Sequence, residues 1–156
     1  MSSNTFMDQF IARKGESITY EGRDIYWTYH IPVRKGDDVV LRLRHFVRQP
    51  VQGIAIDCDD CTARIGGISG NAFQIWTDTA PETVPVQILR AKAGACLAVF
   101  NVWRSDQGQL MLYRLNNAAI DVRPGQADIV VLHCSDGYGP PDFDDLVVEV
   151  VRESSA

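Results

Sequence analysis

The sequence predicts an all-β fold, an antiparallel β-sandwich of the Greek-key or jelly-roll kind with a short N-terminal helical arm. Two observations support this prediction. Short runs of Val, Ile, Leu and aromatic residues recur along the chain, separated by clusters of Gly, Asp, Asn and Pro that favour turns. After residue 16, a helical period is almost absent. Roughly ten short strands at this spacing are typical of a sandwich rather than of a parallel sheet.

The N-terminal arm is the best candidate for a helix. In NTFMDQFIARKG, Asn4 or Thr5 can cap the helix and Gly15 can end it. The apolar residues of this stretch are Phe6, Met7, Phe10 and Ile11. We therefore expect a short amphipathic helix.

The other elements are predicted strands. In chain order they are SITYEG, DIYWTYHIPV, DVVLRLRHFV, QGIAID, ARIGG, AFQIW, VPVQILRA, CLAVFNVWR, QLMLYRL, AAIDVR, ADIVVLHC and LVVEVVR. Two of them, CLAVFNVW and ADIVVLHC, are apolar on both faces, which is typical of central strands. The clearest hairpin is WRSDQGQLMLYRL, because Gly108 can adopt positive φ in its turn.

The chain has the size of one domain: 156 residues, of which 46% are hydrophobic. We expect a single domain over residues 1–156, with an arm (1–16), a sandwich (17–152) and a tail (153–156). Apolar runs of signal-peptide or membrane-span length are missing from the sequence. We therefore expect a cytoplasmic protein, or one exported without a leader.

The charge of the chain argues against a nucleic-acid partner. The formal net charge is −5, whereas binding to phosphates needs a basic face. Arg42, Arg44 and Arg48 could form a local basic patch, but their alternation in VVLRLRHFVR is typical of the solvated side of a strand.

Four aspartates gather in CSDGYGPPDFDD, just before the last predicted strand. Its glycines and prolines predict a shaped loop, in which carboxylates repel one another unless they face water or a cation. Ca²⁺ takes about six to eight oxygen ligands, so Asp136, Asp142, Asp144 and Asp145 are candidate calcium ligands. Two alternatives are an exposed acidic turn that protects an edge strand and a structural clasp with arginines such as Arg104 or Arg114.

This segment, DGYGPPDFDDLVVEV, resembles the calcium loop and final strand of the bacterial calcium-dependent fucose/mannose-binding lectins, whose pattern is E-D-G-x-D-N-D-Y-N-D before a run of valines. It is also similar to D-F-N-D-L-V segments that end other bacterial β-sandwich domains. Residues 142–145 match the D-Y-N-D block, with Phe143 in the aromatic position, and Asp136-Gly137 match its D-G. The resemblance implies calcium held by these aspartates and completed by sugar hydroxyls.

The chain also departs from the lectin pattern. Ser135 stands where the pattern has Glu, Pro140 and Pro141 replace its middle D-N, and one residue is inserted before the D-F-D-D block. The resemblance therefore implies fewer ligands than the two calcium ions of those lectins require.

Cys58 and Cys61, in DCDDC, form a second candidate metal or redox pair. A closed zinc site needs two more ligands, for which Cys96, Cys134 and His133 are the candidates. A redox disulfide would lack the helix N-terminus that lowers a thiol pKa. We expect Cys96 and Cys134 to be buried thiols or an inter-strand disulfide.

The sequence contains no convincing catalytic constellation, so we expect a binding module rather than an enzyme. His133, Cys134 and Ser135 are consecutive, and consecutive strand residues point to opposite faces. The candidate ligand-binding residues are Tyr138, which we expect to be exposed, Gly137 and Asn101. The leading hypothesis is a calcium-binding module with a glycan or protein partner. The alternative is a metal-free interaction or structural sandwich that assembles with itself, and we expect a homo-oligomer.

Overall fold

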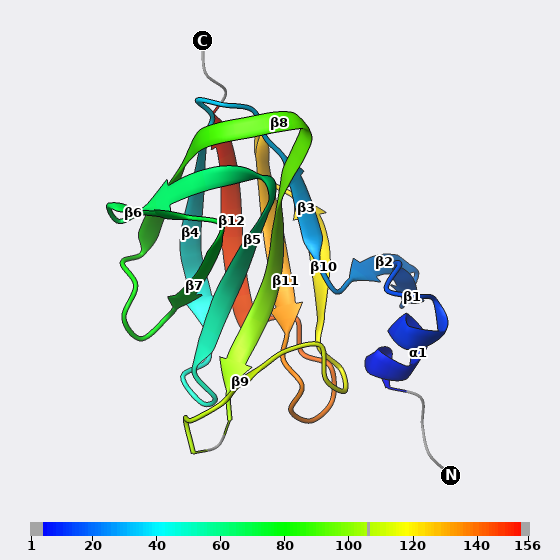
Figure 1. The fold of residues 1–156 in the computed structure, drawn as a ribbon. Helices are drawn as coiled ribbons and strands as arrows, with labels where there is room; N and C mark the ends of the chain where they lie inside the picture. The colour runs from blue at the N-terminus through cyan, green and yellow to red at the C-terminus, as the bar shows by residue number, and fades with distance from the viewer. Residues whose placement is uncertain (1–4, 106, 154–156) are drawn as a thin grey trace.

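A computed structural model of the chain describes residues 5–105 and 107–153. It is all-β apart from one short helix, and its paired strands are antiparallel, which confirms the predicted fold class (Figure 1). The helix α1 (Phe6–Ala12) begins at Thr5. There the Thr5 hydroxyl accepts from the Asp8 amide while the Asp8 carboxylate accepts from the Thr5 amide, a capping box. Gly15 follows the helix with φ +82°, as the sequence predicts.

Twelve strands follow within the described residues. They are β1 (Ile18–Tyr20), β2 (Arg23–Tyr26), β3 (Tyr29–Pro32), β4 (Asp38–Phe46), β5 (Gln52–Ile65), β6 (Ile68–Gly70), β7 (Ala72–Trp76), β8 (Thr83–Arg104), β9 (Met111–Leu112), β10 (Ala119–Pro124), β11 (Ile129–Ser135) and β12 (Leu146–Glu153).

The sheet bends over so that its two sides face each other as two walls, and the long bent strands β5 and β8 join these walls (Figure 1). The hydrogen-bonded order is β1-β2-β10-β11-β12-β4-β8-β5-β6, with β3 and β9 paired to β8 and β7 paired to β5. β8 pairs with β4 through residues 83–87 and with β3 through residues 96–99, so its two halves lie in different walls. The sheet is therefore continuous and folds over on itself. The all-β antiparallel class is therefore confirmed, and the sandwich with its Greek-key or jelly-roll order stays a prediction.

The bends explain why several predicted strands are longer than expected. QGIAID and ARIGG belong to one strand, β5, and VPVQILRA and CLAVFNVWR belong to β8. Asp60 has φ +59° at a register shift between Asp59 and Cys61, and Gly94 has φ +79° within β8. A bulge bends a strand without ending its pairing. The sequence contains the residues at which these strands bend, but it does not show that the hydrogen bonding between β5 and β8 continues past them.

The main core fills the space between the two walls. Its buried side chains come mainly from β3, β4, β5, β7, β8, β10, β11 and β12, and include Leu41, Ile54, Ile56, Leu97, Val99 and Leu132. The predicted hairpin is confirmed: Trp103 pairs with Leu112, and Gly108 has φ +73° in the turn. No helix in the described part of the chain is long and apolar enough to cross a membrane.

A second, smaller core joins the N-terminal arm to the rest of the sheet. It consists of Phe6, Phe10, Ile18, Ile25, Ala119 and Phe143. Phe143 belongs to the acidic loop, so the arm packs directly against the segment that carries the four aspartates.

Candidate functional site

The acidic loop, residues 136–145, connects β11 to β12 and is held by three asparagine side chains. Asn101 Nδ2 donates to the carbonyl oxygen of Ser135 at 2.9 Å. Asn116 and Asn117 donate to the carbonyl oxygens of Gly137 and Gly139, each at 3.2 Å. These contacts fix the course of the loop backbone. Asn101, a predicted ligand-binding residue, is therefore buried and used as a structural donor.

Gly137 lies where no larger residue fits. A Cβ atom at this position would lie 2.5 Å from Cζ2 of Trp103 and 3.0 Å from the carbonyl oxygen of Leu115. The Trp103 side chain is buried, so its ring has little free space to move into. The requirement for glycine here is steric, and ligand contact, the predicted role, is not needed to explain it.

Asp136 and Asp145, at the two ends of the loop, meet in the protein interior. The Asp136 amide donates to Asp145 Oδ2 at 3.0 Å, and the two residues are only 2% and 8% exposed. Burial, together with the negative charges of Asp136 and Asp142, raises the pKa of Asp145 to about 7 despite the lowering effect of the amide hydrogen bond. The two carboxylates thus form an interacting pair in a largely desolvated position.

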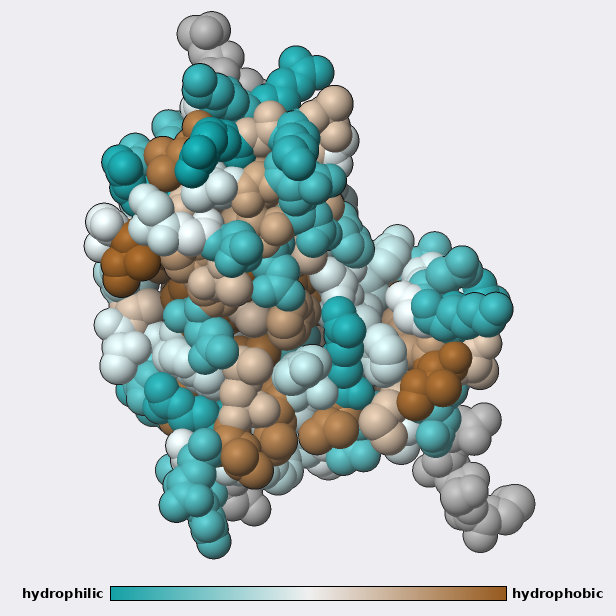
Figure 2. All heavy atoms as spheres, viewed as in Figure 1, coloured by the Kyte–Doolittle hydropathy of each residue, from teal (hydrophilic) through white to brown (hydrophobic). Residues whose placement is uncertain are grey.

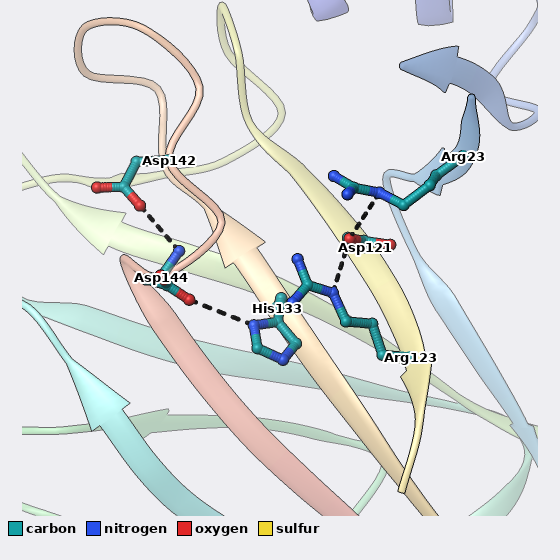
Figure 3. A network of polar contacts seen from close by, with 6 residues as sticks. All are labelled: Arg23, Asp121, Arg123, His133, Asp142 and Asp144. Atoms are coloured by element: carbon teal, nitrogen blue, oxygen red, sulfur yellow. Dashed lines mark hydrogen bonds and ion pairs between the residues drawn. The ribbon is translucent and has the colours of Figure 1, made fainter. Parts of the chain in front are cut away.

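This pair differs from the other buried acids of the protein. The buried aspartates of the described residues are Asp37, Asp121, Asp136 and Asp145. Asp121 lies between two guanidinium groups, Arg23 Nε at 3.1 Å and Arg123 Nε at 2.9 Å (Figure 3). Asp37 pairs with Arg152 at 3.6 Å. Asp136 and Asp145 have no basic partner within the described residues, so their negative charge is not compensated.

The other two loop aspartates are exposed. Asp142 Oδ1 accepts from the Asp144 amide at 2.9 Å, and Asp144 Oδ1 lies 3.4 Å from His133 Nδ1 (Figure 3). Among the described residues, no three His, Cys, Asp or Glu side chains already surround one point in a way that could hold a metal. Of the four predicted calcium ligands, the structure brings two together, keeps Asp142 near them and turns Asp144 toward β11.

Gln52 is a member of the site that the sequence reasoning missed. It is fully buried at the start of β5, and its Nε2 donates to Asp136 Oδ2 at 2.9 Å and to the Pro50 carbonyl at 3.1 Å. Its Oε1 has no hydrogen-bond partner within the described residues. An unpaired buried oxygen is costly. The one sequence signal was an amide residue opening an otherwise apolar strand, QGIAI.

Tyr138 is 41% exposed, as the sequence predicts. Its amide donates to Asp136 Oδ1 at 2.9 Å, so the backbone at Tyr138 adjoins the carboxylate pair. The residue lines an open groove of about 520 Å³ together with Arg48, Arg104 and Ser105. The loop therefore presents an aromatic ring to solvent beside its buried charges.

The structural clasp with arginines is not formed by the residues we considered. Arg104 pairs with Asp78 at 2.7 Å and lies 4.5 Å from the ring centre of Trp76. Arg114 donates to Thr28 Oγ1 at 2.7 Å and lies over the rings of Trp27 and Phe100. Neither guanidinium group contacts a loop carboxylate.

The cysteines do not assemble into one site. Cys58 and Cys61 lie on either side of the bulge in β5, whereas Cys134 is buried in β11, and all four thiols are free. Burial, together with the neighbouring Cys58, raises the pKa of Cys61 to about 12. Cys96 Sγ donates to Asp59 Oδ2 at 3.6 Å. Cys134 and its neighbour His133 are remote from the pair, so the predicted zinc ligands do not converge.

Comparison with protein-family models, with curated protein sequences and with solved structures found no match to this chain.

Proposed function

We propose that this chain is a calcium-binding module whose acidic loop holds Ca²⁺ at Asp136 and Asp145. The observation that carries the proposal is the contrast among the buried aspartates. Asp37 and Asp121 each pair with arginine, whereas Asp136 and Asp145 accept only uncharged hydrogen-bond donors and have no basic partner within the described residues. Two desolvated carboxylates side by side are unfavourable unless they share a proton or bind a cation. An oxygen-only environment favours a hard cation such as Ca²⁺.

Further oxygen ligands are available around the pair. Gln52 Oε1 is buried without a partner on an amide group that already contacts Asp136. The negative charge of Asp142 raises the pKa of Asp145, so Asp142 is an additional carboxylate close to the pair. Calcium accepts about six to eight oxygens, including water and carbonyl groups. These residues supply part of the shell, and solvent or a bound partner supplies the rest.

A glycan is the partner that we propose for this module. Tyr138, whose backbone amide donates to Asp136, has an exposed side chain and lines a groove that also contains Arg104 and Ser105. An aromatic face packs well against the apolar face of a sugar ring. Sugar hydroxyls would occupy the open positions of the ion while the ring contacts Tyr138.

The test is thermal unfolding of EDTA-stripped protein at pH 7.5, with and without millimolar Ca²⁺. A ligand that binds only the native state adds about 2.7 kcal/mol at a hundredfold excess over Kd, or roughly 5–10 °C in Tm for a domain of this size. We expect Ca²⁺ to raise the Tm of the wild type and Asp145→Asn to abolish the increase.

Asp121→Asn is the matched control, because Asp121 is equally buried but compensated by two arginines. This variant should lose stability and keep the full calcium shift. An unchanged wild-type Tm at 10 mM Ca²⁺, or a shift that Asp145→Asn retains, would reject the proposal.

A second candidate function is metal-free assembly through an apolar surface. Leu110, Tyr113 and Leu115 are exposed around β9 and the segment after it, and hydrophobic atoms gather at this end of the molecule (Figure 2). Exposed apolar patches of this kind often mark interfaces. Sedimentation velocity would test self-association: Leu110→Ser/Leu115→Ser should convert an oligomer to monomer, and a monomeric wild type at high concentration would reject this function.

A further inference from the structure

A cavity of about 750 Å³ lies at the end of the molecule opposite the acidic loop. β11 shows the separation, because Ile129 at its start lines the cavity whereas Ser135 at its end precedes the acidic loop. The cavity lies where β3 approaches the β10–β11 turn and β12, and the described strands include no hydrogen-bonded pair between β3 and these elements. At this end of the molecule (Figure 1), β3 is hydrogen-bonded to β8 alone among the described strands.

The cavity has a mixed apolar and polar lining and a suitable size for a small ligand. Side chains of Ile31, Ile129, Val130 and Val150 line it, with Pro32 and Pro124 near its edges. Binding sites for small molecules usually enclose about 300–1,000 Å³ and combine an apolar wall with a few polar groups.

The polar lining of the cavity includes a hydrogen-bond donor that has no acceptor in the described part of the protein. Arg152 Nε is buried and has no acceptor within the described residues, although its Nη2 lies 3.6 Å from Asp37 Oδ2. The Tyr29 hydroxyl is a second potential donor of the lining. Burial raises the pKa of Tyr29 and the positive charge of Arg152 opposes this, so the two side chains are electrostatic neighbours. Arg34 adds a third donor to the lining.

The acids of the cavity are differently placed. Asp37 accepts from the Arg34 amide at 2.8 Å and pairs with Arg152, so it is already occupied. Asp128 is exposed in the turn between β10 and β11. These two negative charges disfavour a ligand with several negative charges, while the buried Nε of Arg152 lacks an acceptor among the described residues.

We propose that this cavity binds a small organic monocarboxylate with an apolar body. The carboxylate accepts hydrogen bonds from Arg152 Nε and the Tyr29 hydroxyl, with Arg34 beside it, and the apolar body packs against Ile129, Val130 and Val150. This site is independent of calcium and of the acidic loop.

The test is isothermal titration calorimetry of the full chain with decanoate, below its micelle-forming concentration, and with decylamine as the matched cation. We expect saturable binding of decanoate and at least about tenfold weaker binding of decylamine. Because a hydrogen bond to a charged group contributes about 1.5–3 kcal/mol, Arg152→Met should weaken decanoate binding by roughly tenfold or more. Tyr29→Phe, which removes only a hydroxyl group, should weaken it severalfold.

Two further variants keep the result interpretable. Arg44→Met removes an arginine from outside the cavity and should leave decanoate binding unchanged. Val130→Trp fills the cavity and should abolish it, provided that circular dichroism shows a folded protein. No saturable decanoate binding by the wild type, equal affinity for decylamine, or undiminished binding to the folded Arg152→Met, Tyr29→Phe and Val130→Trp variants would overturn the proposal.

Discussion

The backbone amide of Asp136 donates a hydrogen bond to the carboxylate of Asp145 at 3.0 Å, which closes the acidic loop on itself. The two residues are nine positions apart in the sequence. Their carboxylates nevertheless lie close enough for the negative charge of Asp136 to raise the pKa of Asp145. The backbone amide of Asp136 thus holds the carboxylate of Asp145 in place. In the absence of a cation, the same arrangement makes the loop costly to ionise.

The first prediction concerns stability against pH without metal. Burial, together with Asp136 and Asp142, raises the pKa of Asp145 from 3.8 to about 7. The folded state therefore holds this proton more tightly than the unfolded state. The contribution of this proton to the free energy of unfolding is fully present below about pH 4 and is lost as the pH rises through about 7. Urea unfolding in EDTA at pH 5, 6, 7 and 8 should show it.

The control is Asp145→Asn, which keeps an oxygen for the Asp136 amide but cannot ionise. The free energy of unfolding of the wild type, minus that of this variant, should fall between pH 5 and pH 8. A difference that stays constant or rises over this window would show that Asp145 titrates normally.

The second prediction concerns Gly137, a glycine of the acidic loop. Gly137→Ala places a Cβ atom 2.5 Å from the buried ring of Trp103, so the loop or the ring must shift. Overpacking of this kind typically costs about 1–3 kcal/mol. Chemical denaturation should show a loss in this range. Gly70→Ala is the matched control, since its nearest contact would be an ordinary 3.8 Å; equal effects of the two substitutions would contradict the steric explanation.

The third prediction concerns cysteine reactivity. Burial raises the pKa of Cys61 to about 12 and also raises that of Cys134. Because the thiolate is the reactive form, iodoacetamide at pH 7.5 should alkylate both residues far more slowly than a free thiol. Peptide mass spectrometry over time would measure each rate. Rapid labelling of Cys61 in the folded protein would instead indicate an activated pair and reopen its redox interpretation.

Much of the fold could be predicted from sequence because local patterns determine it. The helix of the arm begins at Thr5 and the hairpin turns at Gly108, as their capping and turn residues indicate. The continuity of β5 and β8 could not be predicted in the same way. Whether Asp60 and Gly94 end a strand or only bend it depends on the partner strands, which lie far away in sequence.

The candidate site shows the same division between local and distant information. The composition of the loop predicts its shape and its charge, and Tyr138 is exposed as expected. Alternation along a strand cannot show that Asp145 turns inward to Asp136 while Asp144 turns outward to His133. Gln52 joins the site from 84 residues away, which local patterns cannot reveal.

The fourth prediction links the N-terminal arm to the acidic loop. Phe6 is buried, and its ring centre lies 6.2 Å from that of Phe143 within the loop. The Phe6 amide also donates to Asn117 Oδ1 at 3.2 Å, and Asn117 holds the Gly139 carbonyl. Phe6→Ala should therefore cost about 3 kcal/mol, at the low end for a buried aromatic residue, and also loosen the loop.

Hydrogen exchange would separate these two effects. In Phe6→Ala the amides of residues 136–145 should exchange faster than in the wild type, while amides of β5 and β8 change only in proportion to the global loss of stability. If the loop holds calcium, as proposed, the variant should also bind it more weakly. Ile68→Ala, at an exposed position in β6, is the control and should change neither property. Unchanged exchange in the loop of Phe6→Ala would show that the arm and the loop are not coupled.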